Sequence, residues 1–256
     1  MTVKYEVSGG RATITIDDPE RMNPMSVETM NGLLRNTTEA VDDPDVKVIV
    51  YTGAGDRAFC AGGDLAGSFV DDPIGLHRGR GDIADLFRIM WRGGKPTVAR
   101  VNGHALAGGF GLAVACDITI CVDDARLGTS EVRVGLWPMM ISAVLSRVMP
   151  RKAVLELMLT GRTITPEEAQ RLGAVSRVVA RDQLDNAVDE VVETLASLSP
   201  STLMFGKDSF NAMADVSLDT ALDRLQGGLT EIAMSPDATE GVSSFIEKRQ
   251  SHWSGD

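Results

Sequence analysis

Two glycine-rich segments of the sequence could arrange backbone N–H groups around a small oxygen. The first runs over residues 58–65 (AFCAGGDL) and the second over residues 101–111 (VNGHALAGGFG). Each follows an apolar run and precedes a predicted helix, and glycine permits positive φ angles and a close approach of the backbone. The first N–H groups of a helix have no partner within it, so they can bind an oxyanion. Taken alone, either loop is explained equally well by tight turns and close packing.

Several other chemistries fit these segments poorly. Neither loop is a Walker A motif, because no Gly-Lys-Ser/Thr follows. The spacing from Gly103 to Gly108 differs from G-x-G-x-x-G, and this loop does not follow the first strand, so a Rossmann site is disfavoured. We interpret His104 as a hydrogen-bonded structural residue and Cys60 as packing. Without a Ser-His-Asp or Cys-His arrangement in matching context, covalent hydrolysis is a weak alternative.

Glu131 is the carboxylate whose neighbours best suit proton transfer. It lies in the segment TSEVRVGLW, where the apolar residues Val134, Leu136 and Trp137 follow it. Apolar surroundings disfavour the charged form of a carboxyl group and raise its pKa toward the range useful for general acid/base chemistry. The next residues, 138–141 (PMMI), either fill volume beside a ligand or belong to the core.

Strands that alternate with helices must position these residues. Residues 11–16 (RATITI) alternate with period two between a Gly-Gly pair and Asp-Asp-Pro, which predicts a strand. Ser26 is a plausible N-cap for the helix that follows, which carries Met30 inward. The pattern then predicts a buried strand at 46–51, a helix around 83–91 and a strand at 96–101. Such alternation predicts parallel strands joined by crossovers, and hence an α/β protein.

Beyond Met139 the sequence becomes mainly helical. Thr165 and Pro166, followed by two glutamates, predict a helix start. The further elements that we predict are a short strand at 174–179 and helices near 184–198, 202–213 and 218–232. We divide the chain into a core, residues 1–195, and a C-terminal helical region, residues 196–256, which we expect to dock on the core or on a neighbouring subunit.

The composition is typical of a soluble globular protein. The chain has 256 residues, of which 43% are hydrophobic and 24% charged. A formal net charge of −11 disfavours nucleic acids and anionic membranes as partners. No apolar run approaches the roughly 20 residues that cross a bilayer, and the N-terminus lacks the apolar core of a signal peptide. The three cysteines lack metal-ligand spacing, and we expect a reduced, cytoplasmic protein.

The order of the motifs resembles that of the crotonase superfamily, the enoyl-CoA hydratase/isomerase family. Residues 59–65 (FCAGGDL) resemble its first signature, and residues 101–109 (VNGHALAGG) resemble its second. Further matching segments are RMNPM at 21–25, CDI at 116–118 and LTGR at 159–162. The resemblance extends from Arg11 to about Lys248, and several ordered motifs are far more specific than one glycine cluster.

The resemblance implies a fold, a ligand and a site. The fold is a crotonase-like spiral of β-β-α units with a helical C-terminal region, in an assembly that is a homotrimer or a dimer of trimers. The ligand is an acyl-CoA thioester, with coenzyme A as part of the substrate and no separate cofactor or metal. The N–H groups of Gly63 and Gly108 are the implied oxyanion donors. The implied substrate-binding residues are Arg21, Met22, Ala61, Gly63, Asp64, Leu65, Gly108, Trp137 and Lys248.

The resemblance also bears on which reaction is favoured. Hydratases of the family use two glutamates, which here correspond to Gly111 and Glu131, so one carboxylate is absent. We predict Glu131 as the general acid/base. A single carboxylate can move a proton between two carbons, whereas hydration must also orient and deprotonate water. The sequence therefore favours enoyl-CoA isomerisation. We also expect Gly111→Glu to raise hydration, provided that residues 137–141 leave room for water.

Three alternatives stay open at this point. The protein could be a hydratase of weakened activity, or a thioesterase or decarboxylase on the same scaffold. It could also bind acyl-CoA or a protein partner without turnover. Ala66, where some relatives have lysine, and Ser251 and Trp253, where the family's C-terminal motif differs, weaken the assignment of the coenzyme A contacts.

Overall fold

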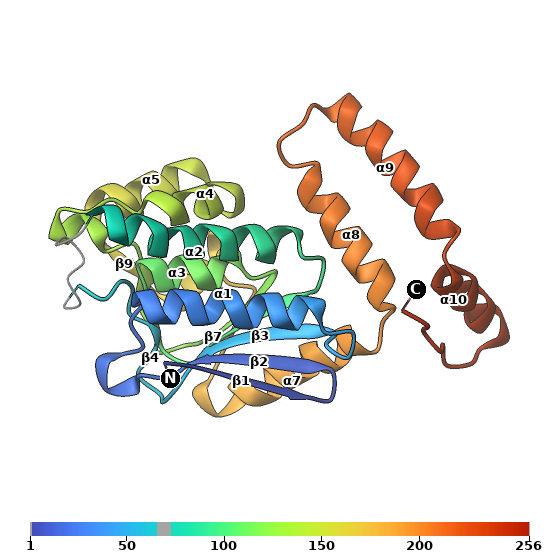
Figure 1. The fold of residues 1–256 in the computed structure, drawn as a ribbon, viewed down its shortest axis with the longest axis horizontal. Coiled ribbons are helices and arrows are strands. Elements are labelled where there is room, and N and C mark those ends of the chain that lie inside the picture. The colour runs from blue at the N-terminus through green and yellow to red at the C-terminus, as the bar shows by residue number, and fades with distance from the viewer. Residues whose placement is uncertain (1, 66–72, 256) are drawn as a thin grey trace.

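The computed structural model describes residues 2–65 and 73–255 of the chain (Figure 1). Its centre is a six-stranded sheet in which β1 and β2 are antiparallel and all other neighbours are parallel. In spatial order its strands are β1 (Val3–Ser8), β2 (Arg11–Ile16), β3 (Val48–Gly53), β5 (Thr97–Val101), β7 (Ile118–Val122) and β10 (Arg177–Val179). A four-stranded sheet contains β4 (Ala58–Cys60), β6 (His104–Leu106), β8 (Leu127–Gly128) and β9 (Thr163–Ile164).

The chain repeats a unit of two strands followed by a helix. The pair β3 and β4 precedes α2 (Pro73–Arg92), β5 and β6 precede α3 (Gly108–Ala115), and β7 and β8 precede α4 (Met139–Val148). In each of these units the first strand joins the large sheet and the second joins the small one. The predicted α/β class with parallel strands, crossovers and β-β-α units is therefore confirmed.

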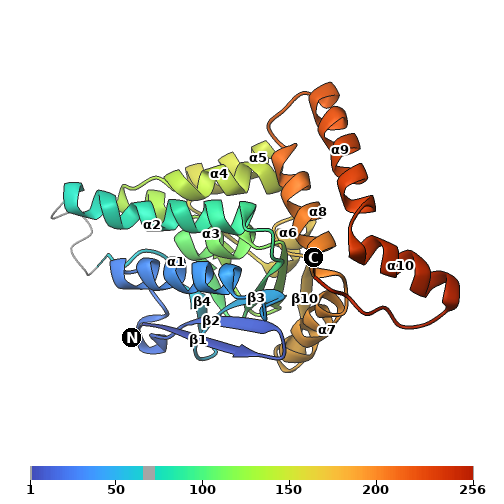
Figure 2. The ribbon, with the colours of Figure 1, turned by 45° about the vertical axis from the view of Figure 1, so that its right-hand side comes forward.

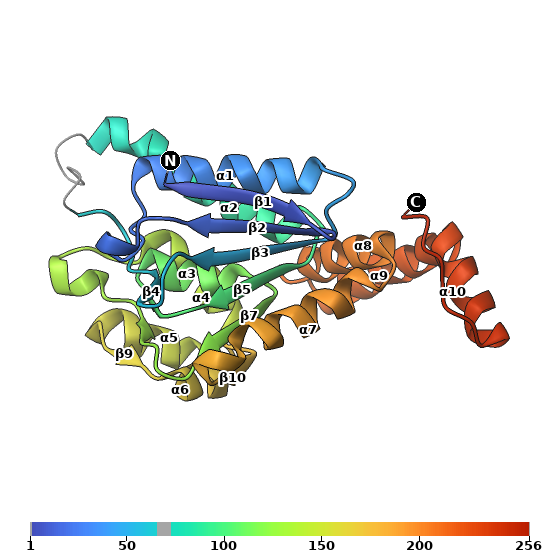
Figure 3. The same ribbon diagram turned by 90° about the horizontal axis from the view of Figure 1, so that it is seen from below.

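Helices cover both faces of the large sheet. Helices α1 (Val27–Asp42) and α2 lie on one face, and α7 (Leu184–Ala196) lies on the other (Figure 3). Because β3 is covered on both sides, all six of its residues are buried. The remaining helical elements are α5 (Arg151–Thr160), α6 (Pro166–Arg171), α8 (Pro200–Ala212), α9 (Leu218–Ala233), α10 (Pro236–Glu247) and the short 3-10 helices η1 (Pro19–Arg21), η2 (Glu131–Val134) and η3 (Arg181–Gln183).

Most predicted helix starts and strands agree with the structure. Ser26 caps α1 by accepting a hydrogen bond from the Thr29 N–H, and Thr165 caps α6 in the same way. The helix predicted around 83–91 begins earlier, at Pro73, because glycines in its first half hide the helical period. One of them, Gly79, lets α2 approach α1, since a Cβ there would lie 3.0 Å from Val27.

The prediction missed β1, β7 and α10. The residues of β1, VKYEVS, alternate apolar with polar, which is a strand pattern that the prediction did not use, although only Val3 of the six is buried. Strand β7 follows α3 after only two residues, Cys116 and Asp117, so little in the sequence separates its apolar residues from those of the helix. Helix α10 leaves Phe245 and Ile246 in solvent, so its apolar residues do not mark a buried face.

The C-terminal helices extend away from the core (Figures 1 and 2). Helix α8 packs against α2, and α9 and α10 pack against α8 and each other. The buried Asp237 carboxylate ties α10 to α8 by accepting hydrogen bonds from the Ser199 and Ser201 hydroxyls. The predicted boundary after residue 195 coincides with the end of α7 within one residue, but the division into two domains stays a prediction.

Two buried asparagines fix the turn that leads from β3 into the first glycine loop. The Asn102 amide accepts a hydrogen bond from Gly53 N–H (3.2 Å) and donates one to the Gly55 carbonyl (2.7 Å). The Asn23 amide donates to the carbonyls of Ala54 (3.0 Å) and Ala58 (2.7 Å). Both side chains are almost completely buried, so water does not reach the backbone groups beside them. The two amides supply the hydrogen-bond partners that these backbone groups would otherwise lack.

We predict that Asn102→Ala lowers the free energy of unfolding by about 2 kcal/mol or more. The change leaves Gly53 N–H and the Gly55 carbonyl without a partner, and each buried unpaired group costs roughly 1–3 kcal/mol. Urea unfolding measures this difference. The matched control is Asn31→Ala on the exposed surface of α1, which should change stability by less than about 0.5 kcal/mol. Equal losses in the two variants would contradict the prediction.

Candidate active site

A cavity of about 560 Å³ lies where the two glycine loops meet η2 and the start of α4. The first loop contributes Ala61, Gly63 and Leu65 to its wall, and the second contributes Ala107 and Gly108. The lining also includes Glu131 and Trp137. The structure thus brings six of the predicted site residues to one cavity: Ala61, Gly63, Leu65, Gly108, Glu131 and Trp137.

The two loops approach closely where Gly62 packs against the Ala107 side chain. Ala107 has φ 50° and ψ −126°, a backbone conformation that residues other than glycine rarely adopt. Its N–H donates to the Gly128 carbonyl (2.8 Å). Gly62 has φ 98°, and a Cβ on it would lie 2.6 Å from the Ala107 Cβ. Only glycine fits at position 62, and this close contact places the following residues, Gly63 and Gly108, on the same cavity.

The amides of Gly63 and Gly108 are available to a ligand. Within residues 2–65 and 73–255, neither N–H donates a hydrogen bond to another group. Gly108 begins α3, where an N–H has no partner within the helix. Met25 holds the first loop in register, because its N–H donates to the Gly62 carbonyl (2.7 Å) and its carbonyl accepts from Asp64 N–H (3.2 Å). That both amides bind one oxygen stays a prediction.

Glu131 is the only carboxylate among the described residues that line the cavity. It begins η2, and its Oε2 atom is buried with no hydrogen-bond partner in the described part of the chain. Burial raises the pKa of the carboxyl group, and a hydrogen bond to its own backbone N–H opposes part of that rise. The predicted rise therefore agrees with the structure. A half-buried carboxylate without a partner, on a cavity wall, is suited to accept and return a proton.

The space beside Gly111 is occupied by Ile141. A Cβ at position 111 would lie 2.1 Å from Cγ2 and 2.5 Å from Cβ of Ile141, and both residues are buried. Ile141 also lines the cavity, so an apolar side chain stands where α3 and α4 meet. A side chain at position 111 would therefore require Ile141 to shift, so the room on which the expectation for Gly111→Glu depends is not present in this arrangement, and its effect on hydration stays a prediction.

Four predicted residues do not line the cavity. Arg21 and Asp64 form an ion pair (2.6 Å) beside the first loop, and the Met22 carbonyl accepts a hydrogen bond from Ala61 N–H (3.0 Å). These three support the loop. Lys248 follows the last turn of α10, at the far end of the molecule from β4 (Figure 1). The structure does not bring Lys248 to the site of its own chain.

The cavity also contains residues that the sequence prediction did not assign to it. Met25 belongs to the segment RMNPM, and Met30 was expected on the inward side of its helix, but neither was expected beside a ligand. Arg80 and Ile83 come from α2, and they are the contribution of that helix to the described lining. The inward position of Ile83 follows from helical periodicity, whereas the cavity depends on how α2 lies against α4.

The described residues 2–65 and 73–255 contain neither a membrane-spanning helix nor a metal-binding cluster. No helix there is long and apolar enough to cross a membrane. No group of His, Cys, Asp and Glu side chains in the same part of the chain could hold a metal ion.

Comparisons with known proteins agree with the geometry. Residues 6–256 match the family model described as enoyl-CoA hydratase/isomerase. A carnitinyl-CoA dehydratase of Proteus mirabilis is 31% identical over 252 residues, which cover 96% of each chain. The crystal structure of an enoyl-CoA hydratase from Mycobacterium smegmatis superposes with a TM-score of 0.94 at 29% identity, covering 99% of both chains. An enoyl-CoA hydratase from Bacillus anthracis gives a TM-score of 0.94 at 27% identity over both whole chains. The predicted crotonase-like fold is confirmed.

We predict that Glu131→Gln stabilises the folded protein near neutral pH. The folded state raises the pKa of the Glu131 carboxyl group above its ordinary value of 4.5. At a pH above 4.5 this group therefore ionises more readily in the unfolded chain than in the folded one, and the difference lowers the free energy of unfolding. The gain from glutamine should be small below pH 4.5, grow as the pH rises through the folded pKa and then stay constant. Thermal unfolding at a series of pH values measures it. A gain that is independent of pH, or a loss at pH 7, would show that the carboxylate is not desolvated.

We further predict that positions 111 and 141 are coupled. Gly111→Ala alone should lower the free energy of unfolding by about 1–3 kcal/mol, because it forces Ile141 out of its packed position. The same change should cost clearly less in an Ile141→Gly background, where both clashing atoms are absent. Urea unfolding of the two single variants and the double variant gives the coupling energy. Additive losses would mean that the two side chains do not compete for this space.

Proposed function

The chain belongs to the enoyl-CoA hydratase/isomerase family, and from that premise we propose that it is an enzyme that isomerises enoyl-CoA thioesters with Glu131 as its single acid/base. One observation carries the proposal. Among the described residues, one carboxylate lines the cavity, and the buried Ile141 side chain fills the space where a second could enter.

The reaction begins at the thioester oxygen. We place this oxygen within hydrogen-bonding distance of the N–H groups of Gly63 and Gly108. Two fixed donors stabilise the negative charge that develops on the oxygen when a proton leaves the neighbouring carbon, C2. Because the donors come from two packed loops, they need little reorganisation during the reaction. They therefore lower the energy of the enolate more than that of the substrate.

Glu131 then carries one proton from C2 to C4. Its carboxylate removes the C2 proton of a 3-enoyl thioester, and the C2–H electron pair delocalises into a dienolate. The protonated carboxyl group returns the proton to C4, so that the double bond moves from C3–C4 to C2–C3 and the atoms balance. The raised pKa of Glu131 favours this exchange, because the group must accept and release a proton in turn.

Hydration is the second candidate, and the relatives favour it. The similar proteins are called enoyl-CoA hydratase and carnitinyl-CoA dehydratase, both of which add or remove water. Such a reaction needs a water molecule that is oriented and deprotonated while C2 is protonated. Here Glu131 would have to do both on a wall that Trp137, Met140 and Ile141 make mainly apolar. We expect this reaction to be the slower one.

The coenzyme A contacts and the assembly are part of the same proposal. Arg21 pairs with Asp64 beside the first loop, and in this proposal its guanidinium meets a phosphate of coenzyme A. Lys248 could reach the nucleotide only from a neighbouring subunit, which suits a homotrimer or a dimer of trimers. Exposed apolar side chains on the C-terminal helices support such an assembly, and the largest are Phe210, Leu218, Leu222, Leu229, Met234, Phe245 and Ile246.

We predict that Glu131→Gln keeps acyl-CoA affinity and lowers the kcat of isomerisation by roughly 10²-fold or more, the usual scale of general acid/base catalysis. Glutamine preserves the shape of the side chain but cannot take up a proton. Steady-state rates with a cis-3-enoyl-CoA substrate and calorimetric binding of a saturated acyl-CoA give the two quantities.

The control for this experiment is Glu193→Gln on the exposed surface of α7, which should change neither quantity. If the rate of Glu131→Gln equals that of the unaltered enzyme, another residue transfers the proton and the assignment is wrong. Lost binding with an unchanged kcat would contradict the proposed role in the same way.

A further inference from the structure

The motif LTGR, residues 159–162, ends α5 and leads into β9. None of its four residues lines the catalytic cavity. The α5–β9 turn, residues 161–163, nevertheless lies against the segment that carries Glu131. It meets that segment at Gly128, before the carboxylate, and at Val132, after it. Gly128 and Val132 are four residues apart, so the backbone of Glu131 is held between two contacts with the same turn.

The first contact is the pairing of β8 with β9. The two strands are antiparallel, and Gly128 lies opposite Thr163. A Cβ on Gly128 would lie 2.8 Å from the Arg162 carbonyl oxygen and 3.2 Å from the Thr163 Cα, so glycine permits this close approach. On its other edge β8 pairs with β6, and the Gly128 carbonyl accepts the Ala107 N–H (2.8 Å). The strand that leads to Glu131 is therefore fixed along both edges.

The second contact is that of Gly161 with η2. Gly161 is buried at the end of α5, where it has φ 63° and its N–H donates to the Leu157 carbonyl (2.8 Å). A Cβ on it would lie 2.9 Å from Cγ1 of Val132 and 3.0 Å from Cγ of Arg133. The long Arg133 side chain can move aside, whereas the branched Val132 side chain is stiff. A larger residue at position 161 would therefore push η2 away from α5.

Such a displacement would reach Glu131 because η2 is one short, internally bonded turn. The Glu131 carbonyl accepts the Leu136 N–H (3.1 Å), and the Val132 carbonyl accepts the Gly135 N–H (3.2 Å). Val132 directly follows Glu131, and consecutive Cα atoms are about 3.8 Å apart. The place of the Glu131 carboxyl group on the cavity wall thus depends on the contact of Val132 with Gly161.

Ion pairs hold the α5–β9 turn itself. The Arg162 guanidinium donates to the Glu156 carboxylate on α5 (2.7 Å) and, through its two other nitrogens, to the Glu168 carboxylate on α6 (2.7 and 3.2 Å). The bidentate pair with Glu168 fixes the direction of the guanidinium as well as its distance. The turn is therefore a firm support for the chain that lies on it.

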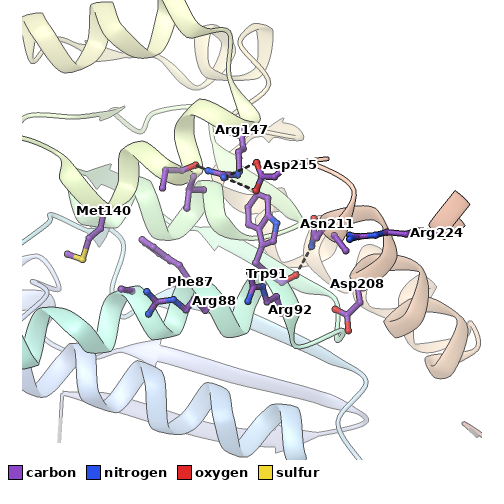
Figure 4. A pocket seen from close by; sticks show the side chains of 14 residues that line it. Phe87, Arg88, Trp91, Arg92, Met140, Arg147, Asp208, Asn211, Asp215 and Arg224 are labelled. Carbon is purple, nitrogen blue, oxygen red and sulfur yellow. Dashed lines mark hydrogen bonds and ion pairs between the residues drawn. The ribbon is translucent and has the colours of Figure 1, made fainter. Parts of the chain in front are cut away.

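Different contacts hold α4, which lines the same cavity (Figure 4). Its Arg147 guanidinium pairs with the Asp215 carboxylate in the turn after α8 (3.0 Å), and the Asn211 amide on α8 donates to the Trp91 carbonyl on α2 (2.7 Å). A displaced η2 would therefore move Glu131 relative to the apolar wall and would leave that wall in place.

We propose that Gly161 is a positioning residue for Glu131, because the lack of a side chain at position 161 sets how closely η2 approaches α5 and, through Val132, where the Glu131 carboxyl group lies in the cavity. The effect on catalysis rests on the proposed function. The placement of the carboxyl group does not, since it is independent of the reaction that the group serves.

The test is Gly161→Ala, with Gly173→Ala as its matched control. Gly173 also follows a helix with a positive φ, 83°, and a Cβ on it would lie 3.3 Å from the Val148 carbonyl oxygen, but no atom of η2 lies within 4 Å of that Cβ. Both changes strain a left-handed backbone position and should lower the Tm. Only Gly161→Ala should also lower the kcat of isomerisation, by on the order of tenfold, with acyl-CoA affinity unchanged, because a slightly misplaced catalytic group slows the reaction without weakening binding.

A second readout does not depend on catalysis. Because the Glu131 carboxyl group is desolvated, Glu131→Gln should raise the Tm more near neutral pH than at pH 4.5. This pH-dependent gain should shrink in the Gly161→Ala background, because displacement from an enclosed position admits water to the carboxyl group. It should stay the same in the Gly173→Ala background. Arg80 on the cavity wall and Arg133 on η2 are retained in every variant.

Val132→Ala supplies the rescue. It removes the methyl group that a Cβ at position 161 would meet, so Gly161→Ala should lower kcat less in this background than in the unaltered enzyme. Should Gly161→Ala fail to fold, Val132→Ile presses one more carbon into the same contact from the side of η2. It carries the same expectations for kcat and for the pH-dependent gain.

Two results would overturn the inference. Equal kcat values and equal pH-dependent gains in Gly161→Ala and Gly173→Ala would show that the contact does not place Glu131. A loss of kcat that Val132→Ala does not relieve would assign the effect to strain at position 161 alone. An unchanged kcat in Glu131→Gln, together with a pH-dependent gain that still responds to Gly161→Ala, would instead overturn the proposed function and support the positioning role of Gly161.

Discussion

The close contact between Gly62 and Ala107 is the constraint on which the site depends. It brings together two loops that follow different strands of the sheets, and it requires both a glycine with a positive φ and an alanine in a rare backbone conformation. Such local strain persists only where the surrounding structure determines it, and here hydrogen bonds to the Gly128 carbonyl, with the Met25 backbone and with the amides of the buried asparagines do so. The sheets, the turn after β3 and the start of α3 therefore act as the frame for two backbone amides.

The remainder of the cavity determines what those amides can be used for. Glu131 supplies a carboxylate whose buried oxygen has no partner in the described chain and whose pKa burial raises, and we expect this to lower stability and, under the proposed function, to suit the group to proton exchange. Ile141 closes the space beside Gly111 and makes the opposite wall apolar. Gly111 on α3 thus packs against Ile141 on α4. A second carboxylate at position 111 would have to displace Ile141, so this contact favours a site with one carboxylate over a site with two.

Much of this could be predicted from the sequence because the signals are local. The caps at Ser26 and Thr165, the buried run of β3 and the glycine loops all depend on neighbouring residues in the chain. The rise in the pKa of Glu131 followed from apolar residues that come directly after it. The contact between Gly111 and Ile141 could not be predicted in this way, because it depends on how closely two helices pack. The distance of Lys248 from the site of its own chain has the same origin, since it depends on the placement of α10.

We propose that this cavity moves a proton and not a water molecule. The most direct measurement is mass spectrometry of the products formed from a cis-3-enoyl-CoA by the unaltered enzyme in ¹⁸O-labelled water. We expect a trans-2-enoyl-CoA of the same mass as the substrate, without ¹⁸O, as the main early product. Unchanged cis-3-enoyl-CoA, together with ¹⁸O-labelled 3-hydroxyacyl-CoA from a parallel reaction with a trans-2-enoyl-CoA, would contradict this, because the cavity would then activate water and would not move a proton between carbons.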